Sequence, residues 1–297
     1  MKKYGFITTY IIVLIIFSIY MVLDTLVLKQ VYTGETISAD YELLDTQTKS
    51  SGMTYKTDTS YEDDNVKINL KEYRQNDTTI YVADIQIVDI AYLKTAFAKG
   101  TFGKNITAKT TEMATEVNAI LAINGDYYGV QENGYVLKNG VLYRQTATKN
   151  RQDLVIYKDG SFGIINEEQI SATDLLDNGA YNILSFGPGL VDNGEIIVST
   201  NTEVAKAMAN NPRTAIGKID DLHYVFVVSD GRTNESKGLS LYELAGFMKN
   251  LGVETAYNLD GGGSSAMYFN GNLVNKPTTN GNRITERSVS DIVYIGY

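Results

Sequence analysis

The stretch from Leu222 to Ser265 decides the fold; it reads LHYVFVVSDGR at 222–232, SLYELAGFMKNLG at 240–252 and TAYNLDGGGSS at 255–265. The first and last segments begin with runs typical of strands, and the first is apolar enough to be buried on both faces. The middle segment has helical spacing, with Ser240 and Glu243 as a capping box and Gly252 as a C-terminal cap. Strand, helix and strand form a crossover, so we expect parallel strands whose C-terminal loops share one sheet edge.

Dipeptides that favour tight turns predict antiparallel hairpins in the rest of the domain. Asn-Gly and Asp-Gly supply the positive φ values that such turns require. They separate apolar runs at Asn139-Gly140, Asp159-Gly160, Asn193-Gly194 and Asn270-Gly271. A second helix is expected over 112–121 and a further strand over 119–123. The expected fold class is α+β, with a mixed, largely antiparallel sheet, hairpins and at least one βαβ crossover, preceded by a single N-terminal transmembrane helix.

The N-terminus predicts a membrane anchor. Residues 4–23 are uncharged and mostly apolar, which is the length that crosses the hydrocarbon layer as a helix. Lys2 and Lys3 precede this segment, so the positive-inside rule places the N-terminus in the cytoplasm and the rest of the chain outside. The alternative is a cleaved signal peptide, but no small-x-small cleavage site follows Leu23. The expected location is therefore the cell membrane, with a single span and an extracellular globular domain.

Three regions follow from this pattern. Residues 1–28 are expected to be a cytoplasmic tip and a transmembrane anchor. Residues 29–65 are expected to be an extracytoplasmic spacer, because they are rich in Thr, Ser, Asp and Glu and lack the hydrophobicity that offsets ordering entropy. Residues 66–297 contain no long linker and no repeat, so one globular domain is expected there.

The composition excludes several classes of site. The 297 residues include no Cys and one His, so there is no disulfide framework, thiolate nucleophile, iron–sulfur cluster or His-pair zinc site. The formal net charge of -9 argues against a nucleic-acid partner, because neutralising phosphates requires a basic face. Carboxylates, Arg, Asn, hydroxyls and backbone amides must therefore build any active site.

Three loops are candidates for that site. Asp230-Gly231-Arg232 and Asp260-Gly261-Gly262-Gly263-Ser264-Ser265 follow the two crossover strands, and open α/β sheets place their ligands at such an edge. Asn124-Gly125-Asp126 would join them if the preceding strand lies in the same sheet and direction. The three glycines favour either a nest of N–H groups for an anion or a plain flexible turn.

Other candidates have ordinary structural explanations. Arg213 and Arg232 suit planar carboxylate or phosphate recognition, but each alone is more typical of a surface arginine. The capping box explains Glu243 without catalysis. Tyr127 and Tyr128 can stack on a sugar ring or pack at the end of a strand.

The chain from about Tyr81 to Tyr297 resembles the phosphodiester glycosidase family, the catalytic-domain type of the lysosomal uncovering enzyme and of bacterial proteins labelled exopolysaccharide biosynthesis proteins. Six motifs in the family's order support the resemblance: Ala122-Ile123-Asn124-Gly125-Asp126-Tyr127-Tyr128, Gly187-Pro188-Gly189-Leu190, Asn211-Pro212-Arg213-Thr214-Ala215-Ile216-Gly217, Asp230-Gly231-Arg232, Gly238-Leu239-Ser240-Leu241-Tyr242-Glu243, and Asn258-Leu259-Asp260-Gly261-Gly262-Gly263-Ser264-Ser265.

The resemblance implies hydrolysis of a sugar-1-phosphodiester at the anomeric carbon. Such a reaction needs a carboxylate to activate water or stabilise the sugar cation, and cationic and N–H donors for the leaving phosphate. Asp126 and Asp260 are the leading catalytic candidates, with Glu243 and Asp230 behind them. The candidates for binding substrate and phosphate are Asn124, Gly125, Tyr127, Arg213, Thr214, Arg232, Gly261, Gly262, Gly263 and Ser264. No cofactor is expected to be required, although the Asp cluster suits Ca²⁺ or Mg²⁺.

The leading functional hypothesis is a membrane-anchored hydrolase that cleaves a GlcNAc-1-phosphodiester-like bond in phosphate-linked cell-envelope glycans. Two alternatives stay open. One is a non-catalytic envelope protein that binds phosphate-containing glycans during exopolysaccharide assembly. The other is a metal-dependent phosphodiesterase that cuts P–O instead of C–O.

Overall fold

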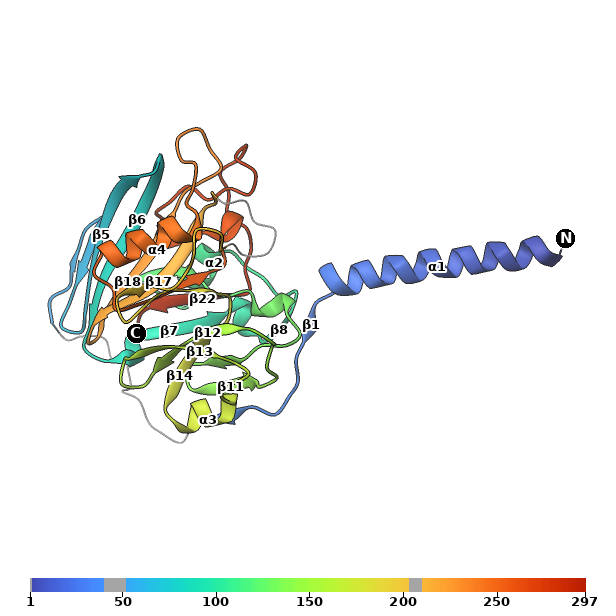
Figure 1. Cartoon of the computed structure of the whole chain (residues 1–297), viewed down its shortest axis with the longest axis horizontal. Coiled ribbons are helices and arrows are strands. Elements are labelled where there is room, and N and C mark those ends of the chain that lie inside the picture. Colours follow the sequence, from blue (N-terminus) through green and yellow to red (C-terminus); the bar gives the residue numbers. More distant parts are fainter. Residues whose placement is uncertain (1, 40–51, 203–209) are drawn as a thin grey trace.

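The computed structural model describes residues 2–39, 52–202 and 210–297, and two antiparallel sheets packed face to face make up its centre. The larger sheet has nine strands. In spatial order these are β16 (Glu195–Ile196), β15 (Gly189–Asp192), β19 (Thr255–Leu259), β17 (Arg213–Asp220), β18 (His223–Ser229), β6 (Thr78–Ile87), β5 (Val66–Gln75), β4 (Ser60–Glu62) and β3 (Tyr55–Lys56). The long hairpin of β5 and β6 lies at one side of the molecule (Figure 1).

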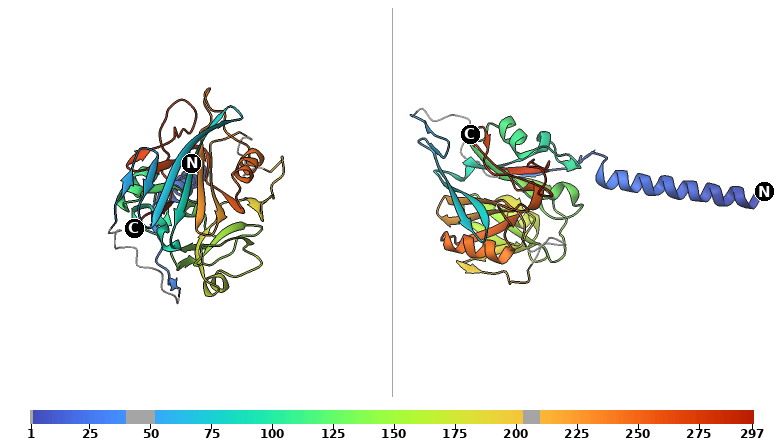
Figure 2. Two further views of the ribbon diagram at one scale, coloured as in Figure 1. Left: turned by 90° about the vertical axis from the view of Figure 1, so that its left-hand side faces the viewer. Right: turned by 90° about the horizontal axis from the view of Figure 1, so that it is seen from above.

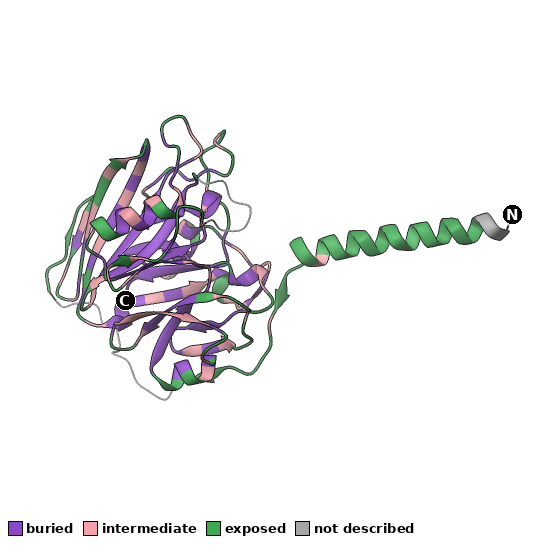
Figure 3. Ribbon diagram, in the orientation of Figure 1, coloured by how far each residue is buried: buried purple, intermediate pink, exposed green. Residues whose placement is uncertain are grey.

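The second sheet has five strands and covers one face of the first. Its spatial order is β21 (Asn272–Leu273), β20 (Met267–Phe269), β9 (Leu121–Asn124), β22 (Asp291–Ile295) and β7 (Leu93–Phe97). The largest apolar cluster joins the sheets, with Phe226 and Tyr257 from one and Leu121, Ile123 and Val293 from the other. Burying these side chains removes apolar surface from water, which is the main favourable contribution to this packing. Figure 3 shows the buried strands at the centre of the molecule.

The crossover at 222–259 has the expected orientation. β18 and β19 both pair antiparallel with β17, which lies between them, so the two strands run parallel to each other. The connecting helix α4 (Leu241–Asn250) begins after Ser240 with the expected capping box. Its Leu244 and Met248 pack with Val225 on the outer face of the large sheet. The crossover therefore brings the loops after β18 and β19 to one edge, as predicted.

All four expected hairpin turns are confirmed. Gly160 has a φ of 85°, and the three Asn-Gly turns have positive φ at both residues, which suits the right-handed twist of paired strands. The Asn193-Gly194 turn lies in the large sheet, and the Asn270-Gly271 turn lies in the five-stranded sheet. The others lie in two three-stranded sheets, whose strands are β13 (Phe162–Asn166), β12 (Gln152–Tyr157) and β14 (Ala180–Leu184) in one, and β10 (Val136–Lys138), β11 (Val141–Arg144) and β2 (Ile37–Ser38) in the other.

The helix expected over 112–121 is shorter than predicted. Helix α2 covers Thr110–Glu116, and Asn118 follows in the left-handed region with a φ of 52°. Leu121 already belongs to β9, where it is fully buried between neighbouring strands. Tertiary packing therefore outweighed the helical spacing at the end of this segment. A further helix, α3 (Ala172–Asp177), covers the β12 sheet, and short 3₁₀ turns occupy η1 (Ile90–Tyr92), η2 (Ala98–Gly100), η3 (Tyr128–Val130) and η4 (Gly262–Ser264).

The N-terminal helix α1 (Lys2–Leu26) extends away from the rest of the molecule (Figures 1 and 2). Its segment Gly5–Leu26 is long and apolar enough to cross a membrane, and none of it is buried in the structure. A signal sequence has the same properties, so this finding concerns length and composition alone.

The expected spacer is in part ordered, which corrects the prediction for its described residues. β1 (Gln30–Val31) pairs with β8 (Gly103–Lys104), and β2 pairs with β11. β3 and β4 extend the large sheet through β5. Backbone hydrogen bonds to existing strands stabilise these segments despite their low hydrophobicity, a contribution that composition does not reveal. The central part of the spacer, 40–51, lies outside the described residues.

Candidate active site

Three neighbouring strands of the large sheet end at the candidate site. In the register of the sheet, Arg213 at the start of β17 is opposite Ser229 at the end of β18, and Thr214 is opposite Leu259 at the end of β19. Asp230 and Asp260 follow directly in the chain. Since adjacent strands lie about 4.8 Å apart, the Arg213, Asp230 and Asp260 positions gather at one edge of the sheet.

The loop after β9 reaches the same edge from the other sheet. Thr214 donates a hydrogen bond of 2.8 Å to Oδ1 of Asn124, and Nδ2 of Asn124 donates one of 2.6 Å to the carbonyl of Asp260. The condition that this strand lies in the crossover sheet is not met, because β9 lies in the five-stranded sheet. Asn124 is a fully buried link between the two sheets, and it brings Gly125 and Asp126 close to Asp260.

Glycines let the three loops approach one another. A Cβ on Gly231 would lie 2.6 Å from the backbone nitrogen of Pro212, and one on Gly261 would lie 2.9 Å from its carbonyl oxygen. Such distances exclude a side chain unless the backbone moves. Gly262 has a φ of 63°, a conformation that glycine adopts without strain.

Most of the N–H groups of the glycine loop are hydrogen-bonded within the protein itself. The N–H of Gly262 donates to the carbonyl of Pro212, and those of Ser264 and Ser265 donate to Gly261 and Gly262. The Gly261 N–H is bonded to the Asp260 carboxylate. The loop therefore has a structural role in aligning Asp260, and its donors are mostly occupied.

Asp260 belongs to a cluster with Ser264 and Arg287. Ser264 donates a hydrogen bond of 2.6 Å to Oδ2 of Asp260, and the Arg287 guanidinium lies 3.3 Å from the same oxygen. Burial raises the pKa of Asp260, whereas the charge of Arg287 and the bond from Ser264 lower it in part. The carboxylate is thus held in place, nearly buried, and more basic than a carboxylate in water.

Arg287 is the site residue that the sequence reasoning missed. It lies in an irregular loop before β22, and its side chain is 42% exposed while it contacts Asp260 and Ser264. The loop contains one turn signal, Asn280-Gly281, but no periodicity that would place Arg287 beside Asp260. The nearest signal to Arg287 was the strongly apolar strand that follows it.

Arg232 is a second cation beside the glycine loop. Its guanidinium donates to the side chain of Asn211 at 2.8 and 3.1 Å and to the carbonyl of Thr279 at 2.5 Å. Both guanidinium groups, of Arg287 and of Arg232, lie at the glycine loop. Arg287 donates to the carbonyl of Gly261. Nη2 of Arg232 lies 2.9 Å from the position that a Cβ on Gly262 would take. Burial lowers the pKa of Arg232, and the charge of Arg287 lowers it further. Among the described residues Arg232 has no carboxylate partner. In the described part of the chain, the two arginines thus share a single carboxylate partner, Asp260, so the pair keeps an excess of positive charge that favours binding of an anion.

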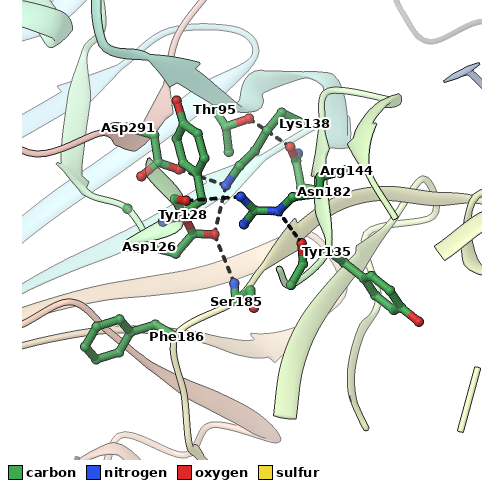
Figure 4. Close-up of polar contacts among 12 residues, drawn as sticks. Thr95, Asp126, Tyr128, Tyr135, Lys138, Arg144, Asn182, Ser185, Phe186 and Asp291 are labelled. Carbon is green, nitrogen blue, oxygen red and sulfur yellow. Dashed lines mark hydrogen bonds and ion pairs between the residues drawn. The ribbon is translucent and has the colours of Figure 1, made fainter. Parts of the chain in front are cut away.

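Asp126 lies deeper, in a buried group with Lys138 and Asp291 (Figure 4). The Lys138 ammonium lies 3.1 Å from Asp126 and 2.8 Å from Asp291, and Ser185 N–H donates to Asp126 at 2.9 Å. Burial, followed by the charge of Asp126, raises the pKa of Asp291 to about 7. Asp126 is 2% exposed and its carboxylate is already bonded by donors of the chain, an arrangement typical of a positioning role.

The neighbours of Asp126 and the remaining candidates occupy different surroundings. Tyr127 is 40% exposed, whereas Tyr128 is buried within an aromatic cluster. Asp230 accepts from Nδ2 of Asn275 and the backbone N–H of Lys276, and its pKa is raised by burial.

Glu243 accepts hydrogen bonds from the Ser240 N–H within the capping box and from the side chain of Asn76. It belongs to helix α4 on the outer face of the large sheet. The structure therefore brings Asn124, Arg213, Asp230, Arg232 and Asp260 together, and it places Glu243 in the helix cap.

The cationic partners of Asp260 and Asp126 matter for metal binding, because they occupy the place where a metal ion would neutralise these carboxylates. Asp260 faces Arg287 and Asp126 faces Lys138, so each carboxylate already has a positive partner. Within the described ranges, no group of three or more His, Asp or Glu side chains is arranged to hold a metal ion. Binding of Ca²⁺ or Mg²⁺ stays a prediction.

Comparisons with known proteins agree with the motifs. A family model described as phosphodiester glycosidase matches residues 117–296. The uncharacterised prophage-derived protein YomE of Bacillus subtilis strain 168 is 30% identical over 192 residues, covering 62% of this chain and 29% of that protein. The mouse N-acetylglucosamine-1-phosphodiester alpha-N-acetylglucosaminidase is 27% identical over 190 residues, covering 58% of this chain and 36% of that enzyme. The chain thus spans about a third of the length of these curated relatives.

Solved structures show the same fold. The zebrafish catalytic domain of that enzyme, auto-inhibited by its pro-peptide, has a TM-score of 0.62 at 22% identity, with 89% of this chain and 88% of that chain covered. A hypothetical protein from Synechocystis has a TM-score of 0.52 at 17% identity, with coverage of 78% and 62%.

Proposed function

Because this chain belongs to the phosphodiester glycosidase family, we propose that it hydrolyses the bond between an anomeric carbon and the oxygen of a phosphodiester. The observation that carries this proposal is the cluster at the sheet edge. It consists of a nearly buried carboxylate, Asp260, and two neighbouring guanidinium groups, Arg287 and Arg232. This combination matches the two charges that develop when a glycosyl–phosphate bond breaks.

The two arginines serve the leaving group. As the bond lengthens, the phosphate gains charge, and a preformed cationic pair stabilises that charge without reorganising. A phosphate monoester has a second pKa of about 6, so it leaves without full protonation by an acid. The site therefore depends less on a strong general acid than a glycosidase with two catalytic carboxylates does.

Asp260 serves the sugar. Its carboxylate stabilises the oxocarbenium-like carbon or takes a proton from the attacking water, and the pKa raised by burial makes it a better base. Asn124 holds the backbone of Asp260, and Tyr127 is exposed beside it for contact with a sugar ring. Asp126 acts through its contacts with Lys138 and Ser185, as a positioning residue.

The proposed location is the outer face of a membrane. The segment Gly5–Leu26 has the length and hydropathy of a single span, and the lysines at positions 2 and 3 favour a cytoplasmic N-terminus. The proposed substrates are phosphate-linked glycans of the cell envelope, which such a domain would meet. Protease protection of the full chain in sealed vesicles tests this orientation: the domain must be digested only from the extracytoplasmic side.

Hydrolysis is tested with the full chain in detergent micelles, because strands β1 to β4 pair with the domain and a truncated fragment would lose them. The substrate is the methyl phosphodiester of GlcNAc-1-phosphate, and the readout is free GlcNAc. We expect turnover by the wild type and a loss of at least about 10³-fold in Asp260→Asn. Glu195→Gln, an exposed carboxylate on a distant hairpin, is the matched control and should keep wild-type turnover.

The bond that breaks is decided in ¹⁸O-labelled water. Attack of water at the anomeric carbon puts the label in the sugar, whereas attack at phosphorus puts it in the phosphate. Label in the phosphate would make the protein a phosphodiesterase. If the protein binds such phosphodiesters tightly but hydrolyses none of them, whichever sugar they carry, the result would instead support a non-catalytic glycan-binding protein.

A further inference from the structure

A pocket lies at the junction between the N-terminal helix and the domain, and the residues of the Asp260 cluster do not line it. Its volume is about 620 Å³. One wall comes from the segment after α1, including Val31 and Tyr32, and the other from Phe102, Tyr143 and Arg144. The two walls are joined by the pairing of β1 with β8, so the pocket is built by the chain segment that leaves α1.

Aromatic rings line much of this pocket. The ring centroids of Tyr32 and Phe102 are 5.1 Å apart, and those of Phe102 and Tyr143 are 5.2 Å apart. Aromatic side chains are enriched where a protein meets the boundary between lipid and water, because their rings suit a partly apolar layer.

Positive charge is the second feature of the pocket. The Lys104 side chain is 8% exposed, and its ammonium lies 3.9 Å from Asp24 and 3.6 Å from Glu132, too far for hydrogen bonds. Glu132 is itself largely exposed and therefore well screened. The hydrogen bonds that Arg144 donates go to three backbone carbonyls, and among the described residues it has no ion pair. Asp24 and Glu132 partly neutralise Lys104, but neither accepts a hydrogen bond from its ammonium. Nη2 of Arg144 is buried and has no hydrogen-bond partner among the described residues. The pocket thus holds two cations with donors that are free for a ligand.

The position of the pocket places it at a membrane surface if α1 spans one. Nδ2 of Asn105, the neighbour of Lys104, donates to the carbonyls of Thr25 and Leu28, which fastens the end of α1 to the domain. Val27 and Leu28 continue the apolar sequence of the helix and are exposed, as is Val31. Residue 30, which lines the pocket, is two positions after Leu28, so at most about 7 Å of chain separates it from the apolar sequence. This length is similar to the thickness of the polar layer of a bilayer.

We propose that this pocket binds the phosphodiester headgroup of an anionic lipid in the membrane that α1 spans, with Lys104 as the principal contact. The inference rests on the membrane location proposed above and is independent of hydrolysis. The exposed apolar residues at the mouth favour a lipid over a soluble sugar phosphate, because a lipid extends acyl carbons past them. Such binding would add to the contacts of Asn105 and β1 in fixing the orientation of the domain on the surface.

The chain contains no Trp, so a single introduced Trp reports on the pocket without background. The experiment uses full-length Tyr143→Trp in vesicles of phosphatidylcholine containing a small fraction of brominated phosphatidylglycerol or of brominated phosphatidylcholine. Bromine quenches Trp on contact. We expect stronger quenching by the brominated anionic lipid, corresponding to an enrichment of about fivefold for one cation near the surface. Lys104→Gln in the same background should abolish the difference.

Controls separate binding from proximity. Tyr242 is an exposed tyrosine on α4, outside the pocket, and Tyr242→Trp should show no preference for the anionic lipid. Phe102→Trp replaces the reporter if Tyr143→Trp does not fold. Equal quenching by the two lipids, or a preference that persists in Lys104→Gln, overturns the proposal. Reversal of the quenching by millimolar glycerol phosphate overturns it as well, because the site would then recognise a free phosphate ester.

Discussion

The Arg287 guanidinium lies 3.3 Å from Oδ2 of Asp260, although the two residues are 27 positions apart and belong to different loops. Ser264 joins them, since it donates to Asp260 and accepts from Arg287. The cluster aligns the carboxylate by hydrogen bonds from both sides and places a positive charge beside it. In the proposed reaction, the cluster supplies a base for the sugar and a cation for the phosphate.

Loss of the Arg287 charge should impair the chemical step. Arg287→Gln is expected to lower kcat/KM about 10²-fold, the usual effect of removing one donor to a developing negative charge. Arg283→Gln, an exposed arginine in the same loop, is the control and should keep wild-type kinetics. Steady-state release of GlcNAc measures both. Equal effects of the two substitutions would exclude a specific role for Arg287.

The acid limb of the pH–rate profile should report Asp260. Burial raises the pKa of this carboxyl, so activity that requires the carboxylate form falls as the pH drops through a value above the ordinary 3.8. Arg287 lowers the pKa of Asp260, hence its removal should move the acid limb to higher pH. The profiles of kcat/KM for wild type and Arg287→Gln test this. A limb that does not move would mean that another group titrates.

Gly262 should matter for activity more than for stability. A Cβ there would lie 2.9 Å from Nη2 of Arg232, and a φ of 63° disfavours alanine. Gly262→Ala is expected to displace Arg232 and to lower kcat/KM at least about tenfold, with a loss of about 1 kcal/mol in stability. Gly246 in α4 has no atom within 4 Å of its Cβ position, so Gly246→Ala should stabilise by about 0.5–1 kcal/mol and leave kinetics unchanged.

Lys138 should be essential for the stability of the domain. Its ammonium is buried and pairs with Asp126 and Asp291, both of which have no exposed side-chain surface. Lys138→Met leaves two facing buried carboxylates, and we expect a loss of about 3–5 kcal/mol in the free energy of unfolding. Lys149→Met changes an exposed lysine and should have almost no effect. Urea unfolding followed by near-ultraviolet circular dichroism of the tyrosines gives both values.

Stability should decrease as the pH rises toward neutrality. The pKa of Asp291 is raised to about 7 in the folded state, so between its ordinary 3.8 and that value the folded protein binds the additional proton. Unfolding then releases protons and becomes easier at higher pH. Burial also raises the pKa of Asp153, which acts in the same direction. Asp291→Asn should therefore reduce the slope of Tm against pH in part, whereas the exposed Asp177→Asn should leave the slope unchanged.

Several elements were predictable from the sequence because they depend on neighbours in the chain. The Asn-Gly and Asp-Gly turns require local φ values that few residues adopt, so their hairpins follow from the residues themselves. The crossover at 222–259 follows from helical spacing, the cap at Ser240 and the handedness of such units. The apolar length of the N-terminal helix is likewise a local property.

The contacts that complete the site were decided by tertiary structure. Lys138 meets Asp291 across 153 positions, and Arg287 reaches Asp260 from a loop without any regular pattern. Strand β9 reaches the site from a second sheet, which its own residues do not specify. Local sequence restricts the backbone over a few residues, whereas the pairing of distant charges depends on how whole sheets pack. The motifs therefore located the edge that carries the site, and the packing of the two sheets determined which charges meet there.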